Sequence, residues 1–307
     1  MKYAIVVPTY NPGAAWSDWV EAVVGQSVQP EVVIVIDSSS TDGQIGSCEP
    51  SAWHIVKIKS AEFDHGGTRN KGFEMAAQHQ VDYVVSLTQD SILADQHAIE
   101  RLLEPFADAQ VAAVCGRQLP RADANVRSKF ARLFNYLPVS FINLKENIPE
   151  RGIKTAFMSN SFAAYRLFAF VEVGRFPEKI IFGEDMYLAA KFILAGWKTY
   201  YNGEASSVHS HNYSLFEDFR RYFDIGVFHR VTPFLREQFG TASGEGLKFS
   251  IKELGYVAKN RFWAIPMVFL EVFTKFVGYK AGYNYKSIPK SIRVKLSLNR
   301  KYWKNAR

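Results

Sequence analysis

Short apolar runs alternate with longer segments of helical periodicity over the first 115 residues, and this pattern constrains the fold more than any other feature. The runs that indicate strands are residues 3–7, 32–36, 55–58, 83–87 and 111–115. The segments that indicate helices are residues 14–25, 68–78 and 96–107. Such an alternation predicts an α/β fold, with a mainly parallel, doubly wound sheet covered by helices on both faces.

The rest of the chain favours helices. Residues 116–155 are less regular and indicate an acceptor loop or a mobile flap. A helix is expected from residue 184 or 185 to Gly196, and a capping box at residues 214–217 begins another. A chain of 307 residues can hold a large α/β domain with an appendage. We therefore expect an α/β domain over residues 1–213 and a helical, basic region over residues 214–307.

The net charge of +7 comes from the C-terminal tail. Residues 275–307 carry ten Lys or Arg and no Asp or Glu, whereas the preceding 274 residues hold 27 basic and 30 acidic side chains. Residues 262–273 are apolar but too short to cross a membrane, and they contain Pro266 and Glu271. A helix lying in the interface of an anionic membrane, followed by a basic segment, fits this pattern. A buried helix covering the α/β domain, or a dimer contact, fits it as well.

The cysteine content and the N-terminus favour a cytoplasmic location. Two cysteines, Cys48 and Cys115, are too few for a disulfide framework and fit a reducing compartment. The first predicted strand begins at residue 3, which leaves no room for a signal peptide.

Polar turns follow three of the predicted strands. They are residues 8–11, 37–40 and 88–91, which include Pro8, Tyr10, Asn11, Asp37, Gln89 and Asp90. Because the carboxyl ends of parallel strands share one edge, we expect these turns to converge on a nucleotide site. Asp37 can there accept a hydrogen bond from a pyrimidine N3–H, or stabilise its own turn together with the serines that follow.

Residues 65–71, His-Gly-Gly-Thr-Arg-Asn-Lys, lie where an extended segment passes into a helix. Adjacent Gly66 and Gly67 allow a tight turn that brings several N–H donors to one anion. Thr68 is the expected N-cap, and the guanidinium of Arg69 suits a diphosphate at the positive end of the helix. A turn without such a function is the alternative, and His65 has no role that the pattern indicates.

Asp90 is the candidate metal ligand. A carboxylate facing a diphosphate repels it unless a divalent cation lies between them, and Mg²⁺ or Mn²⁺ suits oxygen ligands. Gln89 adds only a neutral oxygen. His209 and His211 alternate in an extended segment, so both can face one side and one of them can complete the metal site. An imidazole ligand favours Mn²⁺ over Mg²⁺.

Two further pairs of charged residues are candidates for the site. Glu184 and Asp185 begin a helix after a glycine that leaves room for an acceptor, and either carboxylate can interact with the helix dipole or remove a proton from an attacking hydroxyl. Arg220 and Arg221 lie one turn into the following helix. Either arginine can contact a phosphate, or be a solvated surface charge.

In this order, the motifs resemble those of glycosyltransferase family 2, the inverting enzymes with a GT-A, Rossmann-like fold. The resemblance extends over roughly residues 1–230. Its segments are residues 6–11, Asp37, residues 69–72, Asp90, residues 184–185 and His209. Within the family, residues 63–70, 87–90 and 209–214 look like those of bacterial rhamnosyltransferases, which use dTDP-L-rhamnose to build O-antigen and related surface polysaccharides.

The resemblance implies roles for the candidate residues. Asp37 would contact the base and Arg69 the diphosphate, while Asp90 would bind the metal with the help of His209. The other residues implied at the donor are Pro8, Tyr10, Asn11, Gly66, Gly67 and Gln89. His211, Arg220 and Arg221 would contact the acceptor or a phosphate. The departure from the family is at residues 88–90, Thr-Gln-Asp, where many relatives carry two acidic residues.

Catalysis and partners follow from the same resemblance. Asp185, rather than Glu184, would be the general base that removes a proton from the acceptor hydroxyl. The implied partners are a nucleotide sugar, a glycan or lipid-linked oligosaccharide acceptor, Mg²⁺ or Mn²⁺, and the inner face of the cytoplasmic membrane through residues 262–307. A homo-oligomer is compatible with the sequence.

Three alternatives compete with this interpretation. The same fold can use another nucleotide sugar, such as a UDP-hexose. An oxidoreductase with a dinucleotide site would need Gly-x-Gly-x-x-Gly after the first strand, and residues 8–13 differ from it. A non-catalytic module that binds sugar or nucleic acid fits the basic tail. Nucleic-acid binding, however, does not explain Asp90 or residues 184–185 in a nearly neutral body, so no nucleic acid is expected.

Overall fold

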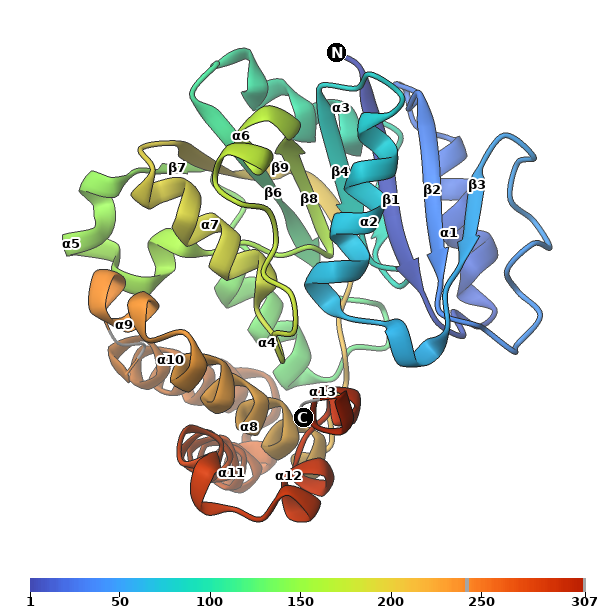
Figure 1. Cartoon of the computed structure of the whole chain (residues 1–307). Helices are drawn as coiled ribbons and strands as arrows, with labels where there is room; N and C mark the ends of the chain where they lie inside the picture. The colour runs from blue at the N-terminus through green and yellow to red at the C-terminus, as the bar shows by residue number, and fades with distance from the viewer. Residues whose placement is uncertain (241–242, 306–307) are drawn as a thin grey trace.

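The computed structural model describes residues 1–240 and 243–305. A central sheet has the order β3-β2-β1-β4-β8-β6-β9-β5, with β7 also paired to β9 (Figure 1). In chain order the strands are β1 Tyr3–Thr9, β2 Val32–Asp37, β3 His54–Lys57, β4 Tyr83–Leu87, β5 Ile92–Leu93, β6 Val111–Leu119, β7 Phe141–Asn143, β8 Phe162–Arg166 and β9 Lys198–Val208.

Helices cover both faces of the sheet and form the C-terminal part of the chain. They are α1 Ala15–Val24, α2 His65–Ala77, α3 Ala98–Leu103, α4 Val126–Asn135, α5 Ile148–Arg151, α6 Leu167–Glu172, α7 Glu184–Leu194, α8 Leu215–Val231, α9 Pro233–Phe239, α10 Ser243–Arg261, α11 Ile265–Tyr283, α12 Lys290–Leu296 and α13 Arg300–Asn305. Short 3₁₀ turns are η1 Ser60–Glu62, η2 Glu104–Ala107, η3 Lys145–Asn147, η4 Gly152–Ala156, η5 Phe262–Ala264 and η6 Tyr285–Ser287.

The predicted α/β architecture is confirmed. Strands β3, β2, β1 and β4 are parallel neighbours, and β6 is parallel to β9. Strand β8, which was not predicted, lies between β4 and β6 and is antiparallel to both. Thr9 pairs with Asp37 in the register of β1 and β2, so the turns after these strands lie side by side. This edge of the sheet carries the candidate site.

Each face of the sheet has its own buried core. Trp16 and Trp19 of α1 stack with ring centroids 4.7 Å apart and pack with α3 against one face. Phe73 of α2 and Phe192 of α7 belong to the core on the other face. The strands between these layers are buried on both sides, which explains why they appear in the sequence as continuous apolar runs rather than as alternating ones.

Two predictions of local structure need correction. Helix α2 begins at His65 rather than Thr68, because Asp64 is the N-cap and its carboxylate accepts the backbone N–H of Gly67. The irregular stretch 116–155 contains the end of β6 and the helix α4, whose Phe130 packs on α10 at 5.1 Å from the ring of Phe249. That stretch is therefore largely built into the fold.

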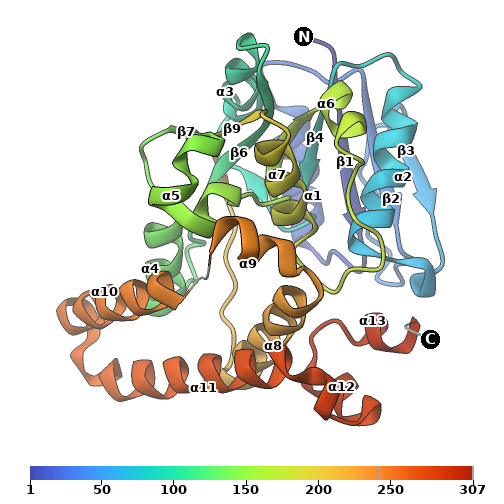
Figure 2. The same ribbon diagram turned by 60° about the vertical axis from the view of Figure 1, so that its left-hand side comes forward.

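The C-terminal helices lie together beneath the sheet (Figures 1 and 2). Ser214 caps α8 through the predicted capping box. Helices α8 and α11 pack closely. Gly278 and Gly282 of α11 allow this contact, because an added Cβ at either position would overlap the backbone of α8. A third core contains Phe223 of α8 and Trp303 of α13, and it also includes residues between 153 and 193. Helix α8 begins just after the predicted boundary at residue 213, and this shared core joins it to the α/β part.

Candidate active site

The turns after β1, β2 and β4 are joined by hydrogen bonds. The backbone N–H of Tyr10 donates to Oε1 of Gln89 over 2.7 Å, and Nε2 of Gln89 donates to the carbonyl of Tyr10. The side-chain oxygen of Asn11 accepts the backbone N–H of Thr41 over 2.7 Å. The predicted convergence is therefore present. Both polar atoms of Gln89 contact Tyr10, and the side chain holds the turn instead of adding an oxygen to a metal site.

Asp37 is buried at the end of β2 and pairs with Thr9, the residue after Pro8 in β1. Its carboxylate accepts the backbone N–H of Ser40 over 3.1 Å, and the hydroxyl of Thr9 lies 3.4 Å away. The turn-stabilising role of Asp37 is thus present in the structure. Its contact with a base stays a prediction.

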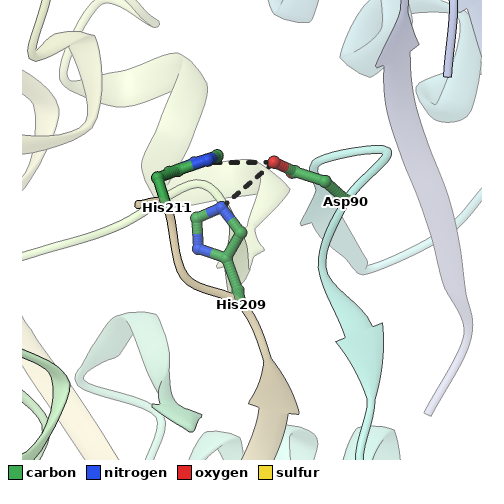
Figure 3. A group of neighbouring side chains, drawn as sticks. All are labelled: Asp90, His209 and His211. Carbon is green, nitrogen blue, oxygen red and sulfur yellow. Dashed lines mark ion pairs between the residues drawn. The ribbon is translucent and has the colours of Figure 1, made fainter. Parts of the chain in front are cut away.

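Asp90, His209 and His211 form one cluster (Figure 3). Oδ2 of Asp90 lies 3.3 Å from Nε2 of His209 and 3.5 Å from Nε2 of His211. One ligand atom from each side chain lies within 4.8 Å of the others. The two histidines follow the end of β9 and face the same side, as their alternation predicted. His211, predicted to contact acceptor or phosphate, is instead part of the candidate metal site.

The protonation states of this cluster suit a cation. Burial and the neighbouring His209 lower the pKa of His211 to about 4, which leaves its ring neutral near pH 7. Burial alone would raise the pKa of Asp90, but its hydrogen bond to His209 and the nearby charges outweigh this and lower the pKa well below its usual range. The cluster therefore presents an ionised carboxylate from Asp90 and a neutral imidazole from His211.

Gln118 orients the second ligand of the cluster. Its Oε1 lies 2.8 Å from Nδ1 of His209, and both side chains are buried. An acceptor at Nδ1 favours the tautomer whose Nε2 carries the lone pair, which is the arrangement found behind metal-bound histidines. The donor set fits a divalent cation, and its two imidazoles favour Mn²⁺ over Mg²⁺. No signal in the sequence singled out Gln118, which lies in the long β6 strand.

Arg69 has a different position from the predicted one. Its Nη1 lies 3.0 Å from Oε1 of Glu184, and the two side chains are only 5% and 7% exposed. The same nitrogen donates to the carbonyl of His65 over 3.0 Å. The charge of Arg69 is therefore compensated inside the protein, and the expectation that it faces a diphosphate needs correction.

The two glycines before Arg69 also have a structural explanation. Gly66 allows close approach to the backbone of Pro177, which an added Cβ would overlap. The N–H of Gly67 is used by Asp64, which also accepts the backbone N–H of Lys179. The predicted glycine nest for an anion is absent from this described segment, because its first turn is capped by the protein itself.

Asn160 binds both carboxylates at the start of α7. Its backbone N–H donates to Oδ2 of Asp185 over 3.1 Å, and its side-chain amide donates to Oε1 of Glu184 over 3.0 Å. Its own Oδ1 accepts the hydroxyl of Tyr165 over 2.7 Å. Glu184 is buried, whereas Asp185 keeps partial access to solvent. Asn160 therefore fixes the geometry of the pair, and sequence reasoning missed it.

The two neighbouring carboxylates differ in acidity. Burial and the charge of Glu184 raise the pKa of Asp185 to about 7. Burial would also raise the pKa of Glu184, but Arg69 and His65 reverse the shift and lower it. Glu184 is therefore ionised near neutral pH, while Asp185 can gain and lose a proton there, as a general base requires.

Three other predicted residues can now be placed. Gly183 precedes Glu184 and has a φ of +76°. The ring of Phe228 fills the space beside Gly183, so the expectation that this glycine leaves room for an acceptor is wrong. Arg220 donates to the carbonyl of Lys295 and stacks on an aromatic ring, which is a surface role. The guanidinium of Arg221 lies 5.6 Å from the ring centre of Tyr213, which is itself next to His211.

Comparisons with known proteins identify the family of the chain. Residues 4–174 match the family described as glycosyl transferase family 2. The chain is 47% identical over 305 residues to the O-antigen chain rhamnosyltransferase WbaN of Salmonella anatum, covering 99% of this chain and 96% of the relative. It is 45% identical over 306 residues to the O-antigen chain rhamnosyltransferase RfbN of Salmonella typhimurium, covering 99% and 97%.

Solved structures share the fold at low identity. The mannosyltransferase PcManGT from Pyrobaculum calidifontis, in complex with GDP-Man and Mn²⁺, has a TM-score of 0.60 at 15% identity and covers 93% of this chain and 88% of its own. S. aureus TarS 1–349 in complex with UDP-GlcNAc has a TM-score of 0.54 at 14% identity and covers 93% and 91%. These likenesses confirm the predicted GT-A fold.

Proposed function

The chain belongs to glycosyl transferase family 2, and on that premise we propose that it transfers L-rhamnose from dTDP-L-rhamnose to a hydroxyl group of a growing, lipid-linked surface glycan. The observation that carries this proposal is the 47% and 45% identity to two O-antigen chain rhamnosyltransferases over 99% of the chain. Both matches cover the α/β part and the C-terminal helices together.

The edge formed by the turns after β1, β2 and β4 is the proposed donor site. Tyr10 exposes its ring there, and Asp37 and Asn11 hold the neighbouring turn. A half-exposed aromatic ring can contact a nucleotide that lies beside it. In this arrangement the nucleoside would lie at β1 and β2, and the diphosphate would lie toward Asp90.

Asp90, His209 and His211 would hold Mg²⁺ or Mn²⁺, with Gln118 behind His209. A cation bound there would neutralise negative charge that develops on the leaving diphosphate. The protein's own contribution is a preset group of three ligands, in which the ring of His211 is neutral near pH 7.

Asp185 is the proposed general base. Its carboxylate would take the proton from the acceptor hydroxyl while that oxygen forms a bond to the anomeric carbon of the sugar. The bond from the anomeric carbon to the diphosphate oxygen breaks, and dTDP leaves. Attack opposite the leaving group inverts the anomeric configuration. The contacts of Asn160 with Asp185 and Glu184 support this assignment, because they hold the base at a fixed place.

A direct assay separates this proposal from its alternatives. Thermal-shift measurements with dTDP-L-rhamnose, UDP-glucose and GDP-mannose, each with and without Mn²⁺, would rank the donors, since a bound ligand stabilises the folded state. We expect the largest shift with dTDP-L-rhamnose. Incubation with a glycan acceptor should then release dTDP. Binding without release would favour a non-catalytic module, and a larger shift with UDP-glucose would reassign the donor.

The C-terminal helices carry a broad apolar surface, which we propose binds an anionic membrane at its cytoplasmic face. Its exposed side chains are Leu247 and Ile251 of α10, Phe262 and Trp263 of η5, and Met267, Phe269, Leu270, Phe273, Phe276 and Val277 of α11. A patch of this composition next to basic residues is typical of interfacial binding.

The same region does not favour a membrane crossing. Residues 244–283 include a stretch that is long and apolar enough to cross a membrane by length and composition. However, Glu271 of α11 is buried and forms ion pairs with Arg127 of α4 and with Lys275. One side of α11 thus faces charged protein groups, and the opposite side is apolar and exposed. Such a helix lies along an interface.

Vesicle flotation tests the membrane proposal. The double substitution Phe269→Glu/Phe273→Glu should abolish binding to anionic vesicles at low salt, while dTDP affinity stays unchanged. Phe168→Glu is the matched control, because Phe168 is equally exposed but lies on α6, outside this surface. If the double variant still floats with vesicles, or if it only converts a dimer to a monomer, the surface has another partner.

A further inference from the structure

The last helix of the chain returns to the sheet domain and ends beside the proposed donor site. Figures 1 and 2 both place α13 next to the segment that leads into α2. The ammonium of Lys301 donates to the hydroxyl of Ser60 over 2.7 Å. It lies 5.0 Å from the ring centre of Tyr10 and 5.7 Å from that of Phe63. Lys301 therefore joins the C-terminal tail to the turns after β1 and before α2.

Helix α13 is held firmly in this position. Asp224 of α8 accepts the hydroxyl of Ser297 over 2.6 Å and the backbone N–H groups of Leu298 and Asn299 over 3.0 Å each. The side-chain amide of Asn299 donates to the carbonyl of Ile181, shortly before the carboxylate pair of α7. Trp303 is buried against Phe223 and Tyr285. These contacts fix the position of the helix that carries Lys301.

The charge of Lys301 has no counterpart in the free protein. Over residues 1–240 and 243–305, no carboxylate is recorded within salt-bridge distance of its ammonium, and its described contacts are a hydroxyl and two aromatic rings. Partial burial lowers the pKa of Lys301. Arg69 and Lys275, by contrast, each have a glutamate partner.

We infer that Lys301 is a donor-binding residue whose ammonium contacts a phosphate group of the bound nucleoside diphosphate. This inference rests on the proposed function. Arg69, which was expected to provide positive charge for the diphosphate, is paired with Glu184, whereas the ammonium of Lys301 is free to pair with an anion. Lys301 faces the ring of Tyr10, which is 49% exposed and borders the donor edge. An anion beside Tyr10 would be attracted to this ammonium and compensate its charge.

Three variants separate the charge of Lys301 from its packing. Lys301→Met removes the ammonium but keeps most of the apolar stem, and Lys301→Arg keeps a cation. Lys304→Met is the matched control, because Lys304 lies on the same helix and is exposed. Titration calorimetry with dTDP, UDP and GDP in the presence of Mg²⁺ gives the affinities, and ligand-observed NMR gives the weak binding of the corresponding nucleosides.

For the nucleoside diphosphate that the wild-type protein binds best, we expect Lys301→Met to weaken binding about tenfold. Binding of the uncharged nucleoside should change less than twofold, and both Lys301→Arg and Lys304→Met should remain near the wild type. Equal affinity in Lys301→Met and wild type would overturn the inference while leaving the proposed function intact. A parallel loss of nucleoside and nucleoside diphosphate binding would assign Lys301 to packing and overturn it as well. If the wild-type protein bound none of the three diphosphates, both the proposed function and this inference would fail.

Discussion

The guanidinium of Arg69 lies 3.0 Å from the carboxylate of Glu184 in an interior that is almost closed to water. This ion pair keeps Glu184 ionised, and the charge of Glu184, together with burial, raises the pKa of the neighbouring Asp185. Arg69 therefore influences the proposed base through Glu184 rather than through contact with the substrate. A cation far away in the sequence is thus connected to the acidity of the proposed base.

Replacing Glu184 by Gln should move the acidic limb of the pH–rate profile to lower pH. Asp185 must be ionised to accept a proton, and its pKa of about 7 predicts that turnover rises as the pH increases through that value. Without the adjacent negative charge the pKa of Asp185 falls, and we expect a shift of about one pH unit. Glu184→Asp keeps the charge and should keep the limb in place. If the acidic limb of the pH–rate profile stays in place in both variants, the charge of Glu184 does not control the pKa of Asp185.

Asp185→Asn should remove catalysis and leave donor binding. An amide of the same shape cannot accept the proton, so turnover is expected to fall by about 10²- to 10⁴-fold. The affinity for dTDP and the thermal stability should stay near those of the wild type, which calorimetry and thermal unfolding can measure. Turnover close to the wild-type rate would exclude Asp185 as the base.

Asp90→Ala and His211→Ala should weaken dTDP binding only when a divalent cation is present. Both side chains belong to the cluster that fits the cation. Removing either one weakens cation binding, and loss of the cation removes a bridge to the diphosphate. Affinities measured with Mn²⁺ and again with EDTA give the comparison. Arg220→Ala is the control, because its guanidinium contacts a carbonyl of the C-terminal region. The same loss in EDTA as in Mn²⁺ would contradict a metal role for the cluster.

Glu253→Gln should stabilise the protein in a pH-dependent manner. Glu253 is buried, neither carboxyl oxygen has a hydrogen-bond partner among the described residues, and burial raises its pKa to about 7. A folded-state pKa above the unfolded one means that the native state binds more protons between these values, so stability falls as the pH rises through that window.

The neutral amide of Gln avoids this loss. Thermal and urea unfolding at pH 8 should therefore show a gain on the order of 2 kcal/mol for Glu253→Gln, with almost none at pH 5. A gain of equal size at both pH values would point to packing instead of ionisation.

Much of the fold followed from local patterns. The strands β1, β2 and β4 appear as apolar runs because both of their faces are covered, and the turns after them converge because parallel strands end at one edge. Asp90, His209 and the carboxylate pair could be selected by residue type and position alone. The N-cap of α2 was misplaced because Asp64 and Thr68 are both good caps, and tertiary packing of Gly66 on Pro177 decides between them.

The residues that were missed depend on contacts between distant parts of the chain. Gln118 matters because β6 lies beside β9 and brings it under His209. Lys301 reaches Ser60 only because Asp224 and Trp303 anchor the last helix. These contacts between distant residues produce no periodic pattern in the sequence from which they could be predicted. Arg69 was predicted to face a diphosphate but pairs with Glu184, since a single sequence does not reveal which acid lies beside it.

The reversed direction of β8 has a consequence for how the site is assembled. Leu87, the last residue of β4, pairs with Phe162, the first residue of β8. One rim of the sheet therefore collects the exits of the parallel strands and also the entrance of an antiparallel one. Asn160 stands just ahead of that entrance, opposite the exits that carry the donor-side turns. Residues just upstream of β8 therefore meet the turns of the proposed donor site at one rim, although the two segments lie far apart in the chain.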